Sequence, residues 1–372
     1  MKVAMFGHKR IPSREGGVEI VVEEISSRLV KLGHEVTCFN RSGHHVSGSE
    51  FDDNDYKDYK GIHLRKVFSI DKKGLAAISS SFFSSILCAI GRYDVVHIHA
   101  EGPALFCFIP KFFGKRVIVT IHGLDHKRSK WGNFAKKVIL QGEKSAARYA
   151  DEIIVLSKEV QKYFLMTYGR IAHLIPNGVN VPNIQPANII KEKFGLYKDS
   201  YVLFLGRLVP EKGISYLLEA WKYINTDKKL VIAGGSSDSD RFVNELKHNA
   251  PDNVIFTGFV QGELLEELYS NAYIYTLPSD LEGMPLSLLE AMSYKNCCLV
   301  SDIDECASVI ESYGVTFKKS DVSDLKSKLQ YLLDNPLEVE KFKSNVQNYI
   351  CDKYNWDDVV NRTLFLYNVQ SK

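Results

Sequence analysis

Short apolar runs alternate with stretches of helical periodicity, and this alternation occurs twice along the chain. In the first half the apolar runs occupy residues 3–7, 35–39, 94–99, 116–122 and 152–157. In the second half they occupy residues 201–206, 229–234, 253–258, 272–278 and 297–302. Strands that alternate with helices form parallel sheets covered by helices on both faces. The pattern therefore predicts an α/β protein with two Rossmann-like domains.

A segment of different composition separates the two halves. Residues 174–186, LIPNGVNVPNIQP, contain three prolines and three asparagines, which is typical of a linker. The length of 372 residues also exceeds what one hydrophobic core usually serves. We therefore predict a first domain at residues 1–178 and a second domain at residues 179–354.

The charge is unevenly distributed between the halves. The formal net charge of +2 argues against a uniformly basic nucleic-acid-coating protein, and no nucleic-acid partner is expected. Residues 1–180 carry 27 Lys and Arg against 18 Asp and Glu, or +9, whereas the remainder carries 20 against 27, or −7. This imbalance predicts that the first domain faces an anionic partner, such as a phosphorylated acceptor or a membrane surface.

Seven scattered cysteines, most of them in apolar stretches and none in a C-x-x-C pair, indicate unpaired buried thiols in a reducing compartment. No run of about 18 uncharged apolar residues is present, so no spanning segment is expected. The expected location is therefore cytoplasmic.

The first chemical motif follows the apolar run that ends at residue 206. Gly206 and Arg207 lie at the end of this predicted strand, and Lys212 lies just before the next predicted helix. Two cations beside a helix N-terminus suit a diphosphate, because the helix-end amides add partial positive charge. A solvated turn with incidental charges is the alternative interpretation.

The second motif is a pair of glutamates eight residues apart, Glu282 and Glu290, after another predicted strand. Glu282 is expected on the loop and Glu290 inside the helix that follows. One carboxylate can then reach a sugar hydroxyl while the other accepts from a ribose hydroxyl. The intervening residues complete the predicted donor site, with the helix-start amides facing phosphate: Gly283, Met284, Pro285, Leu286 and Ser287.

Together these motifs resemble the family 4 glycosyltransferases, which are retaining enzymes of the GT-B fold. Residues 206–213 resemble the diphosphate grip of that family, residues 282–290 its paired-glutamate motif, and residues 175–179 its interdomain linker. The resemblance implies two Rossmann-like domains whose parallel sheets face each other across a deep cleft. It also implies that a helix at residues 355–372, opened by Trp356, returns to the first domain.

Further candidate residues lie in the first domain. Gly16 and Gly17 precede the first predicted helix and would let backbone approach the donor phosphate. His122 matches a family histidine that touches the donor sugar. His97 and His99 are expected on opposite faces of their strand, which leaves His99, at the strand end, as the acceptor-side candidate. The expected catalytic set is His122, Arg207, Lys212 and Glu282.

The opening FGHKRIPSREGGVE resembles bacterial capsule-assembly transferases, including ones that add rhamnose. The resemblance implies transfer of rhamnose from dTDP-rhamnose to a polyprenyl-diphosphate-linked glycan. Neither a metal nor another cofactor is expected, because the leaving diphosphate already meets two cations and a helix start. A UDP-hexose or GDP-hexose donor is the alternative.

Three other classes remain open at this point. A GT-A transferase would bind metal at Asp302 and Asp304, although a helix-capping role suits these residues better. A nicotinamide oxidoreductase would need the G-x-G-x-x-G fingerprint, which is missing after the first strand. A nucleotide-sugar sensor would keep the donor grip without turnover.

Residues 111–148 predict peripheral docking on an anionic membrane. The segment carries a net charge of +8, with Trp131 and Phe134 among its basic residues and the apolar run 106–113 beside it. A solvated basic helix face is the alternative interpretation. The ten basic residues are Lys111, Lys115, Arg116, Lys127, Arg128, Lys130, Lys136, Lys137, Lys144 and Arg148.

Overall fold

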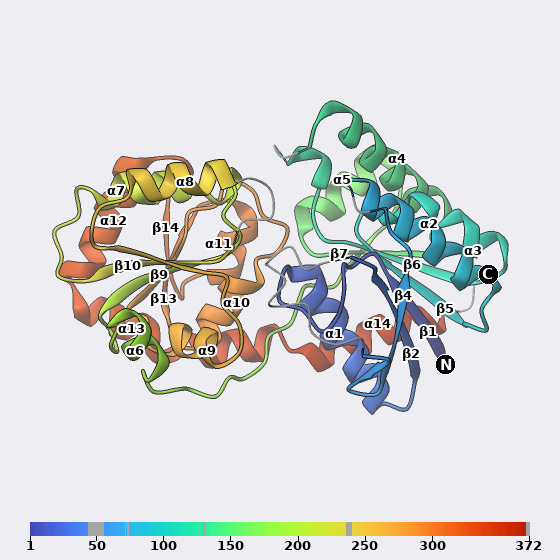
Figure 1. Ribbon diagram of the computed structural model, residues 1–372, viewed down its shortest axis with the longest axis horizontal. Coiled ribbons are helices and arrows are strands. Elements are labelled where there is room, and N and C mark those ends of the chain that lie inside the picture. The colour runs from blue at the N-terminus through green and yellow to red at the C-terminus, as the bar shows by residue number, and fades with distance from the viewer. Residues whose placement is uncertain (44–55, 71, 73, 129–130, 236–239, 370–372) are drawn as a thin grey trace. The chain divides into compact units, whose positions relative to one another are not determined.

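The computed structural model describes residues 1–43, 56–70, 72, 74–128, 131–235 and 240–369. The chain forms two compact units (Figure 1). Unit 1 comprises residues 1–177 and 356–372, and unit 2 comprises residues 178–355. The sequence-based boundaries differ from these by one residue at each junction.

Unit 1 contains an eight-stranded sheet in the order β3-β4-β2-β1-β5-β6-β7-β8. All neighbouring strands are parallel except β3 and β4, which pair antiparallel. The strands are β1 (Lys2–Phe6), β2 (Glu35–Arg41), β3 (Asp58–Tyr59), β4 (Ile62–Val67), β5 (Val95–His99), β6 (Arg116–Ile121), β7 (Glu152–Val155) and β8 (His173–Leu174).

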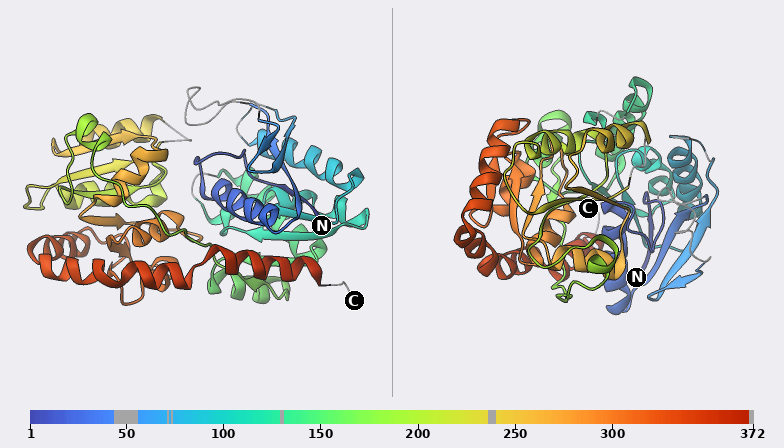
Figure 2. Two further views of the ribbon diagram at one scale, coloured as in Figure 1. Left: turned by 90° about the horizontal axis from the view of Figure 1, so that it is seen from below. Right: turned by 60° about the vertical axis from the view of Figure 1, so that its left-hand side comes forward.

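Helices cover both faces of this sheet, with α2 to α5 on one side and α1 and α14 on the other (Figures 1 and 2). The helical segments are α1 (Gly17–Lys31), α2 (Leu75–Ile90), η2 (Pro103–Phe106), α3 (Phe108–Phe112), η3 (Asp125–Lys127), α4 (Asn133–Tyr149), α5 (Lys158–Tyr168) and α14 (Trp356–Asn368). The η segments are short 3₁₀ turns.

The last helix, α14, packs in unit 1 although it follows unit 2 in the sequence. The Arg28 guanidinium lies 5.9 Å from the centroid of the Trp356 ring, and its Nε donates to Asp357. The Tyr367 hydroxyl lies 2.7 Å from His97 Nδ1 in the sheet. The predicted return of the C-terminal helix to the first domain is therefore confirmed.

Unit 2 contains a six-stranded, wholly parallel sheet in the order β11-β10-β9-β12-β13-β14. Its central strands are buried on both faces, as expected when helices cover a parallel sheet, whereas the two edge strands at 254–258 and 315–317 are mostly half-buried. The six strands are β9 (Tyr201–Leu205), β10 (Lys229–Ala233), β11 (Val254–Gly258), β12 (Ile274–Leu277), β13 (Cys297–Ser301) and β14 (Val315–Phe317).

Helices flank the unit 2 sheet on both sides, with α7 and α8 opposite α9, α10 and α13 (Figure 1). The helical segments are α6 (Ile189–Phe194), η4 (Pro210–Lys212), α7 (Ile214–Trp221), α8 (Asp240–Asn249), α9 (Gly262–Ser270), α10 (Leu286–Ser293), α11 (Asp304–Ile310), α12 (Val322–Asp334) and α13 (Pro336–Lys353).

The strand order of each sheet reverses at one point, and parallel sheets bind ligands beyond the carboxyl ends of the strands at such a point. In unit 1 the reversal lies between β1 and β5, and in unit 2 between β9 and β12. Each unit therefore has one position at which its fold favours a ligand site.

Candidate functional site

The reversal point of unit 2 requires close backbone packing at two glycines. Gly206 follows β9, and its N–H donates to the Ala233 carbonyl at the end of β10. Gly234 has φ +144°, and a Cβ there would lie 1.8 Å from the Gly206 carbonyl oxygen. Only glycine fits at position 234, and its packing fixes the loop that leads to Arg207.

Lys212 and Glu282 meet beyond the ends of β9 and β12. Lys212 Nζ lies 2.5 Å from Glu282 Oε1, and Ser279 Oγ donates to the same oxygen at 2.6 Å. Both charged side chains are buried, with 11% and 6% of their side-chain surface exposed. The structure therefore brings together two predicted site residues that are 70 positions apart in the sequence.

A second glycine holds these two loops against each other. Gly213 has φ +68°, and a Cβ there would lie 1.9 Å from the Pro278 carbonyl oxygen. The Asp280 N–H donates to the Glu211 carbonyl across the same interface. The position of Lys212 relative to the loop of Glu282 is thus set by backbone contacts as well as by the ion pair.

Arg207 lies directly after this junction and is half-buried. Within the described ranges its guanidinium has no hydrogen bond or ion pair, in contrast to Lys212. Lys212 is thus paired with Glu282 inside the site, whereas Arg207 has no such partner among the described residues.

Glu290 lies inside α10, and Glu282 lies on the loop before it. Helix α10 begins at Leu286 without a side-chain cap, and Pro285 is the N-cap residue. The Tyr269 hydroxyl donates to Glu290 Oε2 at 3.1 Å. The structure therefore separates the two glutamates along the chain as the sequence predicts.

Two tyrosines that the sequence does not single out shape this site. Tyr269 orients Glu290, and the hydroxyl of Tyr275 lies 2.9 Å from Ser287 Oγ at the start of α10. Both tyrosines belong to the buried core. Their ring positions follow the ordinary apolar pattern of a helix and a strand, so nothing in the sequence distinguishes their hydroxyls.

The helix-capping role expected for Asp302 is wrong. The N-cap residue of α11 is Ile303, which provides no side-chain cap, and Asp302 Oδ1 accepts from the Lys319 N–H at 2.8 Å. Asp304 begins the helix, where its charge favours the dipole. Among the described residues, one group of three side chains could hold a metal ion, and it comprises Glu101, His126 and Glu143 of unit 1. Asp302 and Asp304 do not belong to it.

In unit 1 the predicted histidines lie at the carboxyl ends of β5 and β6. His99 Nδ1 lies 3.1 Å from His122 Nε2, and His99 is fully buried while His122 is half-buried. A Cβ at Gly7, which follows β1 with φ +110°, would lie 2.0 Å from the His99 carbonyl oxygen. The two histidines thus form one pair at the reversal point of the sheet.

The expectation that His97 and His99 face opposite sides of β5 is wrong. Residues two apart on a strand project from the same face, and the two imidazole rings lie 4.2 Å apart. His97 lies between the Tyr367 hydroxyl and Thr120 Oγ1, at 2.7 Å from each. His97 therefore has a structural position beneath the His99–His122 pair.

Burial keeps these imidazoles neutral. It lowers the pKa of His97 to about 3 and that of His122 to about 4, and it lowers the pKa of His99 well below its usual value. The neighbouring imidazoles lower the pKa of His97 and His99 further. A neutral His122 can accept or donate a hydrogen bond to a hydroxyl.

Gly16 is the N-cap residue of α1, and Gly17 is its first residue. Gly16 has extended backbone, so its conformation does not require glycine. A Cβ would lie 2.7 Å from Glu19 Oε2, and Glu19 also accepts from the Lys9 N–H at 2.8 Å. The absence of a side chain at Gly16 therefore leaves room for Glu19 as well as for any phosphate.

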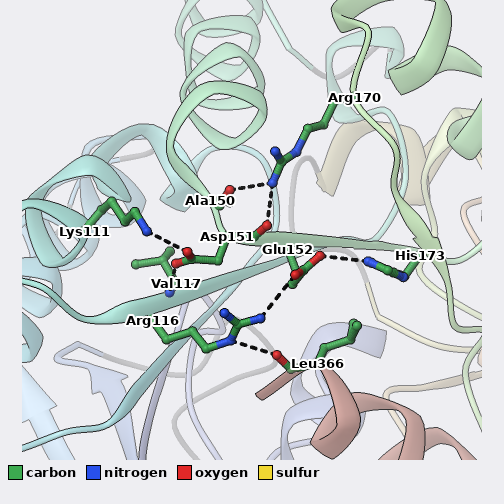
Figure 3. A network of polar contacts seen from close by, with 9 residues as sticks. All are labelled: Lys111, Arg116, Val117, Ala150, Asp151, Glu152, Arg170, His173 and Leu366. Atoms are coloured by element: carbon green, nitrogen blue, oxygen red, sulfur yellow. Dashed lines mark hydrogen bonds and ion pairs between the residues drawn. The ribbon is translucent and has the colours of Figure 1, made fainter. Parts of the chain in front are cut away.

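Several of the basic residues expected to face a membrane are tied into the fold (Figure 3). Lys111 Nζ lies 2.6 Å from Asp151 Oδ1. Arg116 donates to Glu152 at 3.2 Å and to the Leu366 carbonyl at 2.8 Å. Arg116 thus joins β6 to β7 and α14, and Lys111 of α3 is paired with the residue before β7, so neither is a free surface cation.

Most of the remaining exposed charges lie along α4, whereas the exposed Lys127 lies in η3 and pairs with Glu159 at 3.6 Å. Phe134 is 77% exposed, and Lys137, Lys144 and Arg148 are exposed on the same helix. Their spacing of three, seven and four residues places them on one face of the helix. Arg128 pairs with Asp125 at 2.7 Å, and Lys130 lies outside the described residues.

Family models for glycosyltransferases match both parts of the chain. The model described as Glycosyltransferase Family 4 matches residues 15–182, and the model described as Glycosyl transferases group 1 matches residues 187–362. An uncharacterized glycosyltransferase of Methanocaldococcus jannaschii, MJ1607, is 24% identical over 99% of this chain and 98% of its own length. The UDP-Gal:alpha-D-GlcNAc-diphosphoundecaprenol alpha-1,3-galactosyltransferase of Escherichia coli is 28% identical, over 74% of this chain and 75% of its own length.

Solved structures show the same fold. Sucrose-phosphate synthase of Thermosynechococcus elongatus superposes with a TM-score of 0.81 at 21% identity, covering 98% of both chains. Anabaena HepE in complex with UDP-glucose superposes with a TM-score of 0.79 at 15% identity, covering 99% of both chains.

The fold and the matched models define a glycosyltransferase of the GT-B fold. The chain belongs to the family 4 glycosyltransferases. The predicted fold class and enzyme class are thereby confirmed, and the GT-A transferase and the nicotinamide oxidoreductase are excluded. Among the described residues, no helix is both long enough and apolar enough to cross a membrane.

Proposed function

We propose that the enzyme is a retaining glycosyltransferase that moves a sugar from a nucleoside diphosphate to a hydroxyl of a polyprenyl-diphosphate-linked glycan. The observation that carries the proposal is the arrangement at the reversal point of unit 2. There, the available Arg207, the Lys212–Glu282 pair and the uncapped start of α10 adjoin the ends of β9 and β12.

In this proposal Arg207 and the first amides of α10 bind the donor diphosphate. A guanidinium can donate two parallel hydrogen bonds to phosphate, and an uncapped helix start adds N–H donors. Both stabilise negative charge that grows on the leaving diphosphate as the glycosidic bond breaks. No divalent metal is required for this step, since protein groups supply the positive charge.

Glu282 and Glu290 would divide the recognition of the donor. Glu282 on the loop would accept from a sugar hydroxyl while Lys212 keeps it in place. Glu290, oriented by Tyr269 inside α10, would accept from a pentose hydroxyl. With Gly206, Gly283, Met284 and the residues up to Ser287, these groups form the proposed donor site.

The reaction would follow front-face attack, in which the leaving phosphate oxygen takes the proton of the acceptor hydroxyl. The new glycosidic bond then forms on the face from which the diphosphate departs, so the anomeric configuration is retained. His122 would hydrogen-bond the donor sugar, and the hydrogen bond between His99 Nδ1 and His122 Nε2 would orient the His122 ring. Gly16 and Gly17 would allow backbone to approach the donor phosphate.

For the donor we propose dTDP-rhamnose, on the strength of the opening segment alone. This donor has no 2′-hydroxyl on its pentose, so Glu290 would bind the 3′-hydroxyl only. A UDP-hexose is the second candidate, because the E. coli relative is named for UDP-Gal and the HepE neighbour holds UDP-glucose. The lipid-linked acceptor is supported by the diphosphoundecaprenol in the name of the same E. coli relative.

We further propose that the exposed face of α4 docks the enzyme on the anionic cytoplasmic leaflet, where a lipid-linked acceptor resides. Phe134 lies at one end of this face, and Phe112, 73% exposed, packs beside Tyr149 at the other. The Arg148 guanidinium lies 5.3 Å from the same Tyr149 ring. Exposed aromatic rings next to exposed cations suit an interfacial contact with anionic lipid.

The activity is tested by incubating the enzyme with a panel of nucleotide sugars and a prenyl-diphosphate-linked disaccharide, followed by mass spectrometry of the lipid product. We expect transfer from one donor class, dTDP-rhamnose first, and retention of the anomeric configuration by NMR. A ligand at about 100 times its Kd should also stabilise the protein by about 2.7 kcal/mol in a thermal-shift panel. An inverted product would refute the retaining mechanism, and transfer from UDP-hexoses alone would refute the rhamnose assignment.

A further inference from the structure

Two buried carboxylates and one imidazole converge in unit 1. Glu101 and Glu143 are fully buried, and the side chain of His126 is 16% exposed. His126 Nδ1 lies 3.1 Å from Glu143 Oε2 and 3.8 Å from Glu101 Oε1. One ligand atom from each of the three residues lies within 4.8 Å of the others.

The second oxygen of each carboxylate is held by the protein. Glu101 Oε2 accepts from the Asp125 N–H at 2.8 Å. Glu143 Oε1 accepts from the hydroxyls of Tyr163 and Tyr168 of α5, at 2.8 and 2.5 Å. Hydrogen bonds of this kind to the outer side of a ligand orient it toward a bound metal.

The three atoms that face one another in this cluster lack such hydrogen bonds. Glu101 Oε1, Glu143 Oε2 and His126 Nδ1 are buried, and none of them makes a hydrogen bond in the described structure. A buried polar atom without a hydrogen bond is costly, of the order of 1–3 kcal/mol and more when charged. A single cation between the three atoms would satisfy all of them together.

We propose that Glu101, His126 and Glu143 bind a divalent first-row transition-metal ion, of which Zn²⁺ is the best match. Two ligands at 2.0–2.2 Å from a tetrahedral Zn²⁺ lie about 3.3–3.6 Å apart, and the separations of 3.1 and 3.8 Å from His126 Nδ1 to the two carboxylates bracket this range. Imidazole together with carboxylates suits zinc or its neighbours, whereas calcium prefers six to eight oxygens. Water would complete the coordination on the partly exposed side of His126.

The surrounding backbone allows the three side chains to come close together. Glu101 follows β5, His126 lies in η3 after β6, and Glu143 lies in α4. A Cβ at Gly142 would lie 2.0 Å from the Glu101 carbonyl oxygen, so only glycine allows α4 to pack this closely. The metal ion would therefore tie two loops of the sheet to α4 and, through the tyrosines, to α5.

This site would be structural, and it does not depend on the proposed function. Glu101 lies two residues after His99, and His126 lies four residues after His122, so the ion would fix the loops that follow both histidines. A proton is the competing occupant. Without a cation, burial and the neighbouring Glu143 carboxyl raise the pKa of Glu101 to about 11.

The test uses the full-length enzyme, stripped with EDTA, returned to chelator-free buffer and titrated with ZnCl₂. We expect one equivalent of Zn²⁺ to bind. At about 100 times the Kd it should raise the unfolding midpoint of unit 1 by about 5–10 °C. Glu101→Gln, which preserves shape but removes the ligand charge, should lose this shift while its metal-free form stays folded by circular dichroism. His126→Asn removes a second ligand, at a partly exposed position, and should also lose the Zn²⁺-induced shift.

The matched control is His173→Asn, because His173 Nε2 also lies 2.8 Å from a glutamate, Glu152, in the same unit but without a second carboxylate. This variant should keep the full Zn²⁺-induced shift. Absence of a shift in the unmodified protein, or an equal shift in Glu101→Gln, would overturn the proposal and leave a proton shared within the cluster.

Discussion

Lys212 Nζ and Glu282 Oε1 lie 2.5 Å apart in unit 2, where they join the loop after β9 to the loop after β12. The pair is almost fully buried, and Ser279 Oγ donates to the same carboxylate oxygen. Two functional motifs that the sequence presents separately are thus one structural unit. The ion pair also has a consequence for stability that can be measured apart from activity.

Removing either partner of this pair should destabilise the fold. Lys212→Met leaves a buried carboxylate without its cation, and Glu282→Gln leaves a buried ammonium without its anion. Either change should cost about 3–5 kcal/mol, whereas the double variant should recover part of the loss. Urea unfolding of the four proteins measures the coupling. Additive losses would show that the two side chains stabilise the fold independently.

Arg207→Ala should lower turnover by about 10²–10³, as when one group that stabilises transition-state charge is lost. Arg241→Ala is the matched control, since this arginine is 89% exposed on α8 and pairs only with Glu245 among the described residues. Steady-state transfer assays on both folded variants check the prediction. Equal activity of the two variants would remove Arg207 from the donor site.

The two glutamates should have separable effects on binding. Glu290→Ala should weaken binding of the free nucleoside diphosphate, because the proposed contact is to the pentose. Glu282→Gln should mainly impair binding of the intact donor, because the proposed contact is to the sugar. Tyr269→Phe should have a smaller effect in the same direction as Glu290→Ala, since it removes the hydroxyl that orients Glu290. Calorimetric titration with both ligands distinguishes these cases, and identical profiles would refute the division.

Unit 1 should lose stability as the pH falls below about 6.5, the ordinary histidine pKa. Burial lowers the pKa of His97 to about 3 and of His122 to about 4, so the folded form stays neutral while the unfolded chain takes up protons. Each such histidine should lower the unfolding free energy by about 2 kcal/mol between pH 7 and pH 5. Urea unfolding of His97→Gln should show a shallower pH dependence than the unmodified protein, and His63→Gln, at an exposed histidine, should not. An unchanged slope in His97→Gln would contradict this account.

The docking surface should depend on α4. Lys137, Lys144 and Arg148 changed together to Glu should abolish co-sedimentation with anionic vesicles and leave nucleotide binding intact. The same charge reversal at Lys193, Lys198 and Lys247 of unit 2, all exposed, is the control and should not matter. Binding should also fall as salt rises, because charges are screened beyond about 10 Å at 0.1 M. Equal binding to neutral and anionic vesicles would leave α4 as ordinary solvated surface.

Much of the fold follows from hydrophobic periodicity, but its irregular parts do not. The buried strands were predicted to within two residues at either end, because uncharged apolar runs bounded by polar residues are distinctive. The sequence does not predict β4, since IHLRKV mixes apolar with charged residues and resembles a loop, nor the two- and three-residue strands β3, β8 and β14. The Lys212–Glu282 pair could be predicted only as two motifs, because no sequence rule gives the distance between loops 70 residues apart.

The sequence also gives no indication of the proposed metal-ligand cluster. Glu101, His126 and Glu143 are separated by 25 and 17 residues, which matches no ligand spacing, and only the packing of α4 at Gly142 brings them together. The shared face of His97 and His99, by contrast, does follow from the sequence, because residues two apart on a strand project to the same side. Their rings accordingly lie 4.2 Å apart.

The most direct test of the donor site is calorimetric titration of dTDP and UDP into the unmodified enzyme, Arg207→Ala and Arg241→Ala. A charge-assisted hydrogen bond to phosphate contributes about 1.5–3 kcal/mol, so Arg207→Ala should weaken the preferred nucleotide by about 10–100-fold. Arg241→Ala should bind it as the unmodified enzyme does. Unchanged affinity in Arg207→Ala would contradict the claim that the diphosphate binds at the carboxyl ends of β9 and β12.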